Sequence, residues 1–446
     1  MRPPARTPAR VPGSASCKRF HIFFNLSSEN CIAAIDFGTS NSAVCVVNDG
    51  HVFPIPLEHG HTTMPTAVFH NAEQGVTTFG RQALSQYEEG NEGRLMRSLK
   101  SLLGSDLLGE TTVVNGRAMS YKQIIGQFLR HLRDLAESHA SCPIERVVLG
   151  RPVHFVDDDD ERDKLAEATL AAIAQEIGFA EVRFQYEPIV AALDLEAALE
   201  KDELTLVCDI GGGTSDFSVV RVGPSRARKL DRSGDVLASA GIHIAGTDFD
   251  QRLSMSSVMP HLGYGAPGKE GRSVPTSVYF DLATWHKINF LYSFRELARA
   301  EELKLFMLAE GMHRRLMAVL RGRHGHRIAS HVEKAKIAVA EKGSARIDLS
   351  FIEPGLGVEI SESALSDALS PLLDRIADCA LQAVARAGIA PNDVTILYFT
   401  GGSTGLRHLR ERLQRAFPTS RVVAGDKFSS VVRGLGLSAP GQFAIE

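Results

Sequence analysis

The sequence lacks any run of about 18 apolar residues, the length that a membrane-spanning helix needs, so we predict no contact with a membrane. It also lacks an excess of either charge. The 49 basic and 53 acidic side chains leave a formal net charge of −4, which argues against a nucleic-acid partner over the whole chain. Apolar residues make up 44% and charged residues 23%, which excludes a disordered chain, a collagen-like repeat and a long coiled coil.

Cysteine is scarce, and none of the six cysteines belongs to a CxxC pair, which argues against a zinc site. Cys31, Cys45 and Cys208 lie in apolar, strand-like runs, where a free thiol packs as a small apolar residue. Free thiols are typical of a reducing compartment, so we expect a cytoplasmic protein.

The first 30 residues differ from the rest, with five basic side chains, four prolines and the single acid Glu29. The apolar piece at residues 20–26 is too short for a secretory signal. Charge would suit an organelle transit peptide, but the prolines disfavour the helix that such a peptide forms. We predict a disordered basic tail without chemistry of its own.

Two segments about 170 residues apart repeat one pattern. Each has an apolar strand, an Asp, an apolar residue, a Gly-rich turn, a Thr-Ser pair and a second apolar strand. The copies read IAAIDFGTSNSAVCVV at 32–47 and LVCDIGGGTSDFSVV at 206–220. Asp36 therefore corresponds to Asp209, and Thr39 to Thr214.

Each copy is predicted to be a β-hairpin with glycine at the bend. Glycine lets bare N–H groups approach a ligand, and successive N–H groups form an anion cradle to which Thr39 and Thr214 add hydroxyl donors. An aspartate beside a phosphate makes sense if hydrated Mg²⁺ lies between them. The alternative is two ordinary hairpins, but the same Asp, Gly and Thr order in both favours phosphate binding.

The spacing of the copies favours two similar α/β halves that each present one hairpin to a central cleft. A P-loop is not expected, because no GxxxxGK[ST] pattern occurs. A dinucleotide-binding fold is not expected either, because these glycines lie between two strands instead of opening a helix.

Both hairpins resemble the phosphate loops of the DnaK-type 70-kDa heat-shock chaperones, which belong to the actin-like ATPase superfamily. IDFGTSNS (35–42) is similar to the first loop and DIGGGTSD (209–216) to the second. Further similar segments follow in family order: RSLKSLLG (97–104), VLGRPV (148–153), YEPIVAAL (186–193), AGTDFD (245–250), FTGGS (399–403) and VVRGLGL (431–437). The resemblance covers about residues 31–440 and looks closest to the YegD-type branch.

This resemblance implies the actin-like α/β fold, with two ribonuclease H-like lobes around a nucleotide cleft. We expect lobe I at 31–204 and lobe II at 205–440, with an atypical insertion at about 254–330. The insertion is locally basic and shows a long helical pattern from about Phe294 to Val319. A solvated helical face is one interpretation of this charge, and a docking surface for an acidic partner is the other.

The resemblance also implies ATP or ADP with Mg²⁺ as cofactors. Asp36, Asp209 and Asp216 are the metal candidates. Lys100, Glu187, Asp209 and Thr214 are the catalytic candidates: Lys100 would place a cation on the γ-phosphate, and Glu187 and Thr214 would position water or take its proton. The nucleotide-binding candidates are Gly38, Thr39, Ser40, Gly211, Gly212, Gly213, Thr214, Gly246, Glu333, Lys336, Gly401, Gly402 and Ser403.

Several of these residues also have a structural interpretation. With Arg94 and Arg97, Lys100 could belong to the solvated face of an amphipathic helix. Glu187 precedes Pro188, which suits a helix start. Gly401 and Gly402 could form a plain turn from strand to helix.

The sequence departs from the family at the adenine site. Ile337 and Gly405 stand where the family has the two arginines that sandwich the base, so nucleotide preference and affinity are open. Arg407 is a candidate substitute. The chain also ends soon after the closing helix, which leaves no room for the family's peptide-binding sandwich.

We therefore expect an Hsp70-like ATP-binding protein with slow Mg²⁺-dependent ATP hydrolysis, related to chaperones, with a client protein or co-chaperone as partner. One alternative is a small-molecule kinase of the same superfamily, for which Asp248 and Asp250 are the motif-linked base candidates. Another is a nucleotide-gated scaffold or filament protein with little catalysis.

Overall fold

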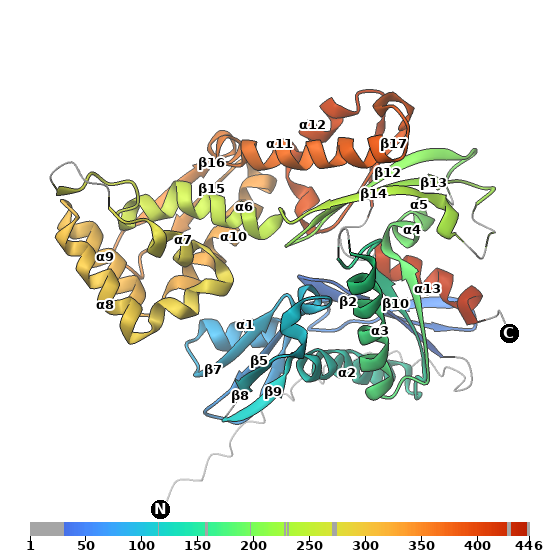
Figure 1. Cartoon of the computed structure of the whole chain (residues 1–446), viewed down its shortest axis with the longest axis horizontal. Helices are drawn as coiled ribbons and strands as arrows, with labels where there is room; N and C mark the ends of the chain where they lie inside the picture. The colour runs from blue at the N-terminus through green and yellow to red at the C-terminus, as the bar shows by residue number, and fades with distance from the viewer. Residues whose placement is uncertain are drawn as a thin grey trace, which may run out of the picture.

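The computed structural model describes residues 31–443, apart from 115, 157–158, 197, 227–228, 230–231, 270–273, 426–429 and the side chains of 194 and 233. The basic tail predicted for residues 1–30 lies outside the described residues. The described chain has two lobes, each built on a mixed β-sheet, and their sheets lie one above the other on the right of Figure 1.

The first lobe contains a six-stranded sheet. Its strands are β1 (Ile32–Phe37), β2 (Asn41–Asn48), β3 (His51–Pro54), β4 (Thr63–Pro65), β10 (Arg146–Arg151) and β11 (Glu181–Tyr186). Their order is β11–β10–β1–β2–β3, with β4 paired to β2. β1 runs parallel to β10 and antiparallel to β2, so β1 and β2 form the predicted hairpin.

The second lobe contains a five-stranded sheet. Its strands are β12 (Glu203–Ile210), β13 (Ser215–Val222), β14 (Val236–Ile242), β17 (Ile396–Thr400) and β18 (Arg421–Ala424). Their order is β14–β13–β12–β17–β18, with β12 parallel to β17 and antiparallel to β13. β12 thus takes the place of β1, so the short repeat seen in the sequence reflects a repeat of the whole sheet.

Two helices lie between the sheets, α4 (Glu187–Ala191) and α13 (Ser430–Phe443). Their apolar side chains form one cluster with Ala34 of β1 and Val207 of β12. Gly434 allows this packing, because a Cβ there would lie 2.0 Å from the carbonyl oxygen of Val190. Although α13 follows lobe II in sequence, it packs against β1, β2 and β10 of the first sheet (Figure 1).

Longer helices cover the outer faces of both sheets. They are α2 (Tyr121–Ala140) and α3 (Asp160–Glu176) in the first lobe, and α6 (Gly246–Leu253), α10 (Gly325–Lys342), α11 (Glu362–Arg386) and α12 (Arg407–Ala416) in the second. Successive residues of a strand point to opposite faces, so Ile35 packs beneath α2 while Ala34 faces α13. Both faces of the central strands are buried, which explains their continuous apolar runs.

Smaller elements surround this frame. In lobe I they are β5 (Ala67–Asn71), β6 (Thr77–Phe79), α1 (Gly80–Glu88), β7 (Gly93–Arg97), the 3₁₀ helices η1 (Leu99–Leu102) and η2 (Asp106–Gly109), β8 (Thr111–Val114), β9 (Arg117–Ser120) and α5 (Leu193–Glu196). In lobe II they are the 3₁₀ helices η3 (Ser233–Asp235), η9 (Pro391–Asp393) and η10 (Gly402–Gly405), and the hairpin of β15 (Ser344–Asp348) and β16 (Gly357–Ser361).

The insertion forms a helical extension of lobe II, on the left of Figure 1. It contains η4 (Ser254–Val258), η5 (Met259–Leu262), α7 (Ser277–Ala283), η7 (Trp285–Tyr292), α8 (Phe294–Glu302), η8 (Leu303–Leu305) and α9 (Glu310–Arg321). The single helix predicted from Phe294 to Val319 is therefore wrong. It is interrupted where Phe306 and Met307 pair with the loop at Gly268 and Lys269.

No helix in the described ranges is long and apolar enough to cross a membrane. Cys45, Cys142 and Cys208 are free thiols, and these three, Cys31 and Cys379 are all buried, as predicted for the cysteines in strand-like runs.

Candidate functional site

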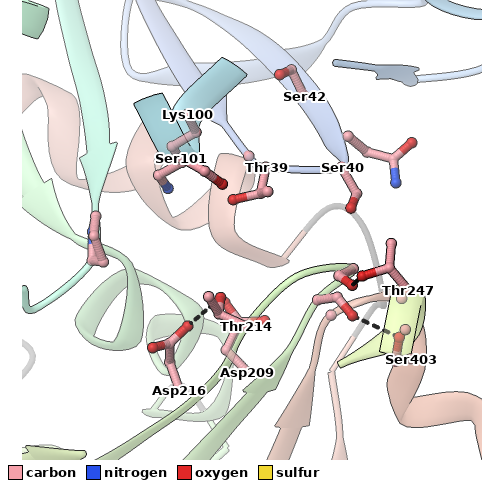
Figure 2. Close-up of a pocket in the computed structure, with 18 of the residues that line it drawn as sticks. Thr39, Ser40, Ser42, Lys100, Ser101, Asp209, Thr214, Asp216, Thr247 and Ser403 are labelled. Atoms are coloured by element: carbon pink, nitrogen blue, oxygen red, sulfur yellow. Dashed lines mark hydrogen bonds between the residues drawn. The ribbon is translucent and has the colours of Figure 1, made fainter. Parts of the chain in front are cut away.

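A cleft of about 1010 Å³ lies between the lobes and is lined by side chains from both. The two hairpin turns enter it from opposite sides. Figure 2 shows Thr39 and Ser40 of the first turn facing Asp209, Thr214 and Asp216 of the second across the open part of the cleft. The predicted hairpins therefore meet in one site.

Each turn has a glycine at a position where other atoms of the hairpins lie too close for a side chain. A Cβ on Gly38 would lie 2.2 Å from the carbonyl oxygen of Asn41, within its own hairpin. A Cβ on Gly212 would lie 1.8 Å from Oγ of Ser40, on the opposite lobe. The two turns are thus almost in contact, and neither has room for a side chain at these positions.

Two neighbouring loops hold the second turn in place. Ser403 Oγ donates to the carbonyl of Gly211 (2.6 Å), and the N–H and hydroxyl of Thr247 donate to the carbonyl of Gly212 (2.7 and 2.8 Å; Figure 2). Gly246 N–H also donates to Gly211 (3.2 Å). These bonds fix the carbonyls away from the ligand side, so the turn can present N–H groups to an anion.

The residues predicted for the second cradle differ in whether their backbone N–H groups are free to bind an anion. The N–H of Gly211 donates to the carbonyl of Thr214 (3.0 Å) inside the turn. The N–H groups of Gly212, Gly213 and Thr214 have no acceptor among the described residues. The second cradle is therefore built by Gly212–Thr214, with Gly211 shaping it.

Lys100 lies inside the cleft and pairs with Glu187. Its Nζ is 2.6 Å from Glu187 Oε1, and both side chains are nearly buried, at 11% and 12% exposed. Burial alone would lower the pKa of Lys100, but the carboxylates of Glu187, Asp36 and Asp209 hold this pKa above its usual value. Lys100 is therefore a fixed cation at neutral pH.

The solvated helix proposed as the alternative for Lys100 is wrong. Arg94 and Arg97 lie on strand β7, and Lys100 lies on the short helix η1. Between them, Ser98 adopts a left-handed backbone conformation with φ of 55°. This turn redirects the chain, so that the residues on its two sides do not share a helical face.

Two aspartates lie beside this pair, one at the end of each central strand. Burial, together with repulsion from Glu187, raises the pKa of Asp36 to about 7 and that of Asp209 to about 8. Such shifts mean that burial, together with the neighbouring carboxylates, disfavours the ionised forms more than Lys100 favours them. A divalent cation would supply the missing positive charge.

The carboxylates fit an ion that keeps its own water. Among the described residues, no three His, Cys, Asp or Glu side chains converge closely enough to bind a metal directly. Mg²⁺ dehydrates reluctantly and is often held through waters and phosphate oxygens. The charge of Asp36, Asp209 and Asp216 and their spacing therefore suit hydrated Mg²⁺ better than a fully protein-bound ion.

Thr214 connects the cradle to Asp216. Its hydroxyl donates to Asp216 Oδ2 (2.8 Å; Figure 2). A hydroxyl that donates in this way keeps its lone pairs for an incoming donor. Thr214 can thus accept a proton from a water molecule while its own proton points to a carboxylate.

The outer part of the cleft contains the residues that the resemblance assigns to adenosine. Glu333, Lys336 and Ile337 of α10 line it, opposite Gly401, Gly402 and Gly405. Lys336 is tied to its own lobe, because Nζ lies 2.8 Å from Asp250 Oδ1 and donates to the Gly246 carbonyl (3.1 Å). It stabilises the start of α6, which supports the Gly246 loop.

Arg407 does not replace the absent arginines. It lies on the surface, where it pairs with Glu362 (2.9 Å) and Glu411 (3.4 Å). Arg410, one turn later on α12, lines the cleft instead and donates to the Thr404 carbonyl (2.6 Å). Arg410 could have been identified from the sequence, because residues three apart on a helix lie on neighbouring parts of its surface, so Arg407 and Arg410 were both candidates to reach the cleft.

A contact between the lobes at the cleft rim was not predicted from the sequence. The Arg97 guanidinium of β7 lies 4.5 Å from the ring centre of Trp285, and Trp285 contacts His326 edge to face (4.6 Å). Tyr87 of α1 contacts the same His326 (4.6 Å) and donates a hydrogen bond to Asn289. We call these five residues the rim clasp.

Comparison with known proteins agrees with this geometry. Residues 106–259 match the family model described as Hsp70 protein. A curated relative, the chaperone protein DnaK of Metamycoplasma hominis, is 26% identical over 385 residues, which are 84% of this chain and 52% of that protein. The chain thus spans about half the length of this relative.

The family match covers β10, β11 and the second phosphate hairpin, while the relative's similarity extends over most of the chain. Both agree with the repeated sheets, the facing hairpins and the order of motifs. The chain has the actin-like ATPase fold, and it is similar in sequence to proteins of the Hsp70 family.

Proposed function

We propose that the chain is a chaperone-related member of the Hsp70 family, which binds ATP with Mg²⁺ in the cleft and hydrolyses it slowly. The observation that carries this proposal is the buried Lys100–Glu187 pair, set beside the aspartates of two facing hairpins. Hydrolysis of a phosphoanhydride depends mainly on positioning and on charge stabilisation. This arrangement supplies a fixed cation, two N–H cradles and an excess of carboxylate.

Each residue group has a distinct part in the proposed reaction. The N–H groups of Gly212–Thr214 bind phosphate oxygens, and the Lys100 ammonium stabilises charge that develops on the transferred phosphoryl group. Asp36, Asp209 and Asp216 would hold Mg²⁺ through water, and such an ion would supply positive charge beside the phosphates. Lys100 is charged at neutral pH because the surrounding carboxylates raise its pKa.

Water activation falls to Glu187 and Thr214. Glu187 holds Lys100 in place and is close enough to the same space to orient a water molecule. Thr214 accepts a hydrogen bond from that water while its own hydroxyl proton is directed at Asp216. The proton released by the attacking water thus has a path to a carboxylate.

The kinase alternative has less support. Its base candidates are both engaged in lobe II: Asp248 Oδ2 accepts from the backbone N–H of Ala245 (2.9 Å), and Asp250 lies 2.8 Å from Lys336. Asp248 caps the first turn of α6, and burial raises the pKa of Asp250 to about 6. A free acceptor hydroxyl would thus find no unengaged carboxylate at either position.

Phosphate release from Mg-ATP tests the proposal. Lys100→Ala and Asp209→Ala should each lower turnover at least about tenfold, the effect of 1.4 kcal/mol in the barrier. Lys122→Ala is the matched control, because Lys122 forms an exposed pair with Glu176 (2.8 Å) on the surface of lobe I. Turnover unchanged in both cleft variants would contradict the site assignment.

Removal of Lys100 leaves Glu187 without its buried partner, so folding has to be checked in parallel. Circular dichroism and a thermal melt would separate loss of the site from loss of the fold. A second variant, Glu187→Gln, keeps the shape of the pair and removes the negative charge. It should bind Mg-ATP and hydrolyse it more slowly.

We also propose, from the family alone, a cytoplasmic location, a client protein or co-chaperone as partner, and kinship with the YegD-type branch. A nucleotide-gated scaffold is the alternative that the experiment above distinguishes, since it would bind Mg-ATP without turnover in the wild type.

A further inference from the structure

One helix of the insertion presents apolar side chains to solvent. Phe294 is 90% exposed and Leu305 is 71% exposed, while Ala300 and Leu303 on the opposite side are buried in the lobe II core. Ala298, between them, is also exposed. The spacing of Phe294, Ala298 and Leu305 places them on one face of α8 and η8.

Exposed apolar side chains also occur beyond both ends of α8. Phe290, 69% exposed, lies on η7, four residues before Phe294, and Leu308, 57% exposed, lies three residues after Leu305. The turn from Phe290 to Phe294 is fixed, because the N–H and hydroxyl of Ser293 both donate to the Phe290 carbonyl (3.3 and 3.0 Å). We call Phe290, Phe294, Ala298, Leu305 and Leu308 the α8 face.

Exposed apolar side chains are concentrated here. Among the described residues twelve large apolar side chains are exposed, and five of them lie between Phe280 and Leu308. All three exposed phenylalanines are in this segment. Single exposed apolar residues are common, but a contiguous set on one face marks an interaction surface.

The insertion around the face has a net positive charge, although α8 itself also carries the exposed acids Glu301 and Glu302. The insertion carries eleven Lys and Arg against six Asp and Glu, although the whole chain has a net charge of −4. Several of its acids are already paired: Glu296 with Arg299 (3.0 Å), Glu301 with Arg321 (2.7 Å) and Asp281 with Lys287 (3.5 Å).

Two cations beside the face have no such pair. Arg295 and Lys304 form no ion pair within the part of the chain that the structure describes, and both side chains are exposed. A partner that covers the apolar stripe would therefore meet unpaired positive charge at its edge. Acidic side chains would complement it, and acids at an interface rim also accelerate association.

We propose that the α8 face docks an amphipathic acidic helix of a partner protein. Two helices pack side by side at 8–10 Å when apolar ridges interlock, and a stripe spaced by three and four residues suits this geometry. The face lies at the outer end of the insertion, away from the phosphate hairpins (Figure 1), and outside the residues 106–259 of the family match. The proposal is independent of ATP hydrolysis.

Two synthetic amphipathic peptides test this docking. Both have the same row of leucines on one face of the helix, and the other face carries glutamate in one peptide and lysine in the other. Binding of each peptide to the full chain is measured by fluorescence anisotropy. The acidic peptide should bind at least about tenfold more tightly, and its affinity should fall with salt. No binding of the acidic peptide, or equal binding of both, would overturn the proposal.

Two double variants locate the site. Phe294→Ser with Leu305→Ser should abolish binding of the acidic peptide. The matched control is Val113→Ser with Leu165→Ser, which replaces two other exposed apolar residues, in lobe I (67% and 62%). Equal loss in both variants would contradict the assignment to α8.

Sedimentation of the wild type without peptide completes the test. A monomer is expected. A dimer that Phe294→Ser with Leu305→Ser dissociates would show that a second copy of this chain occupies the face, and it would overturn the acidic partner.

Discussion

The inner and outer ends of the cleft are built differently. At the inner end, the two lobes contribute equivalent hairpins, so Asp36 and Asp209 and the two Gly-rich turns face each other. At the outer end, the lobes contribute unlike residues: Arg97 and Tyr87 from lobe I and Trp285 and His326 from lobe II. The proposed phosphate site thus follows from the repeated fold, whereas the contacts between the lobes at the outer end depend on the insertion.

The outer end also departs from the family in its own lining. Ile337, 49% exposed, and Gly405 provide no cation for a base to stack on. The Arg97 guanidinium, which also lines the cleft, stacks on Trp285. Burial lowers the pKa of Arg97, opposed by the carboxylates of Glu333, Asp250 and Glu88. We infer that the phosphates supply most of the nucleotide affinity and that the rim clasp retains the nucleotide.

The largest effect is expected at the inner end. Gly38→Ala forces a Cβ to within 2.2 Å of the Asn41 carbonyl, so the first hairpin has to open. Overpacking of this kind costs about 2 kcal/mol, which would weaken Mg-ATP binding about thirtyfold by calorimetry. Gly109→Ala is the control, because nothing lies within 4 Å of a Cβ there. Equal affinity of the two variants would mean that the first hairpin does not bind phosphate.

The rim clasp should give the next largest effect. Trp285→Ala removes the stacking partner of Arg97 and the edge contact with His326. A desolvated cation–π contact is worth up to about 2 kcal/mol, so we expect release of a fluorescent ADP analogue to become about tenfold faster. Trp285→Phe keeps an aromatic ring and should release it at close to the wild-type rate. Faster release in both, or in neither, would contradict a role for the clasp.

The inner end of the cleft could be predicted from the sequence, whereas the outer end could not. The hairpins follow from local patterns, since Asp36 and its glycine turn are adjacent in the chain. Lys100 and Glu187 were identified by resemblance, but their pairing spans 87 residues. The rim clasp could not be predicted, because Tyr87 and Asn289 are 202 residues apart and neither belongs to a recognisable local pattern. The helix break after α8 could not be predicted either, because it depends on pairing with the loop at Gly268.

A smaller gain is expected from restoring a cation to the outer end. Ile337 is half-exposed, and an arginine there would reach the base at a solvated site, where a cation–π contact is worth about 0.5–1 kcal/mol. Ile337→Arg should therefore bind ATP about two- to fivefold more tightly in an equilibrium titration. Ile337→Leu, which adds no charge, should leave the affinity unchanged. Equal affinity for all three proteins would place the base elsewhere in the cleft.

The last expected effect concerns folding stability and not the ligand: stability should change with pH at the clasp. Burial, with the nearby Arg97 charge, lowers the pKa of His326 from 6.5 to about 3. Because the folded state binds this proton less readily, the neutral ring contributes stability above pH 6.5 that is lost as the pH falls towards 3. Between pH 7.5 and 5 the wild type should lose about 2 kcal/mol more than His326→Asn in urea unfolding. Parallel losses in the two proteins would show that His326 is accessible to protons in the folded state, and that the clasp is open in solution.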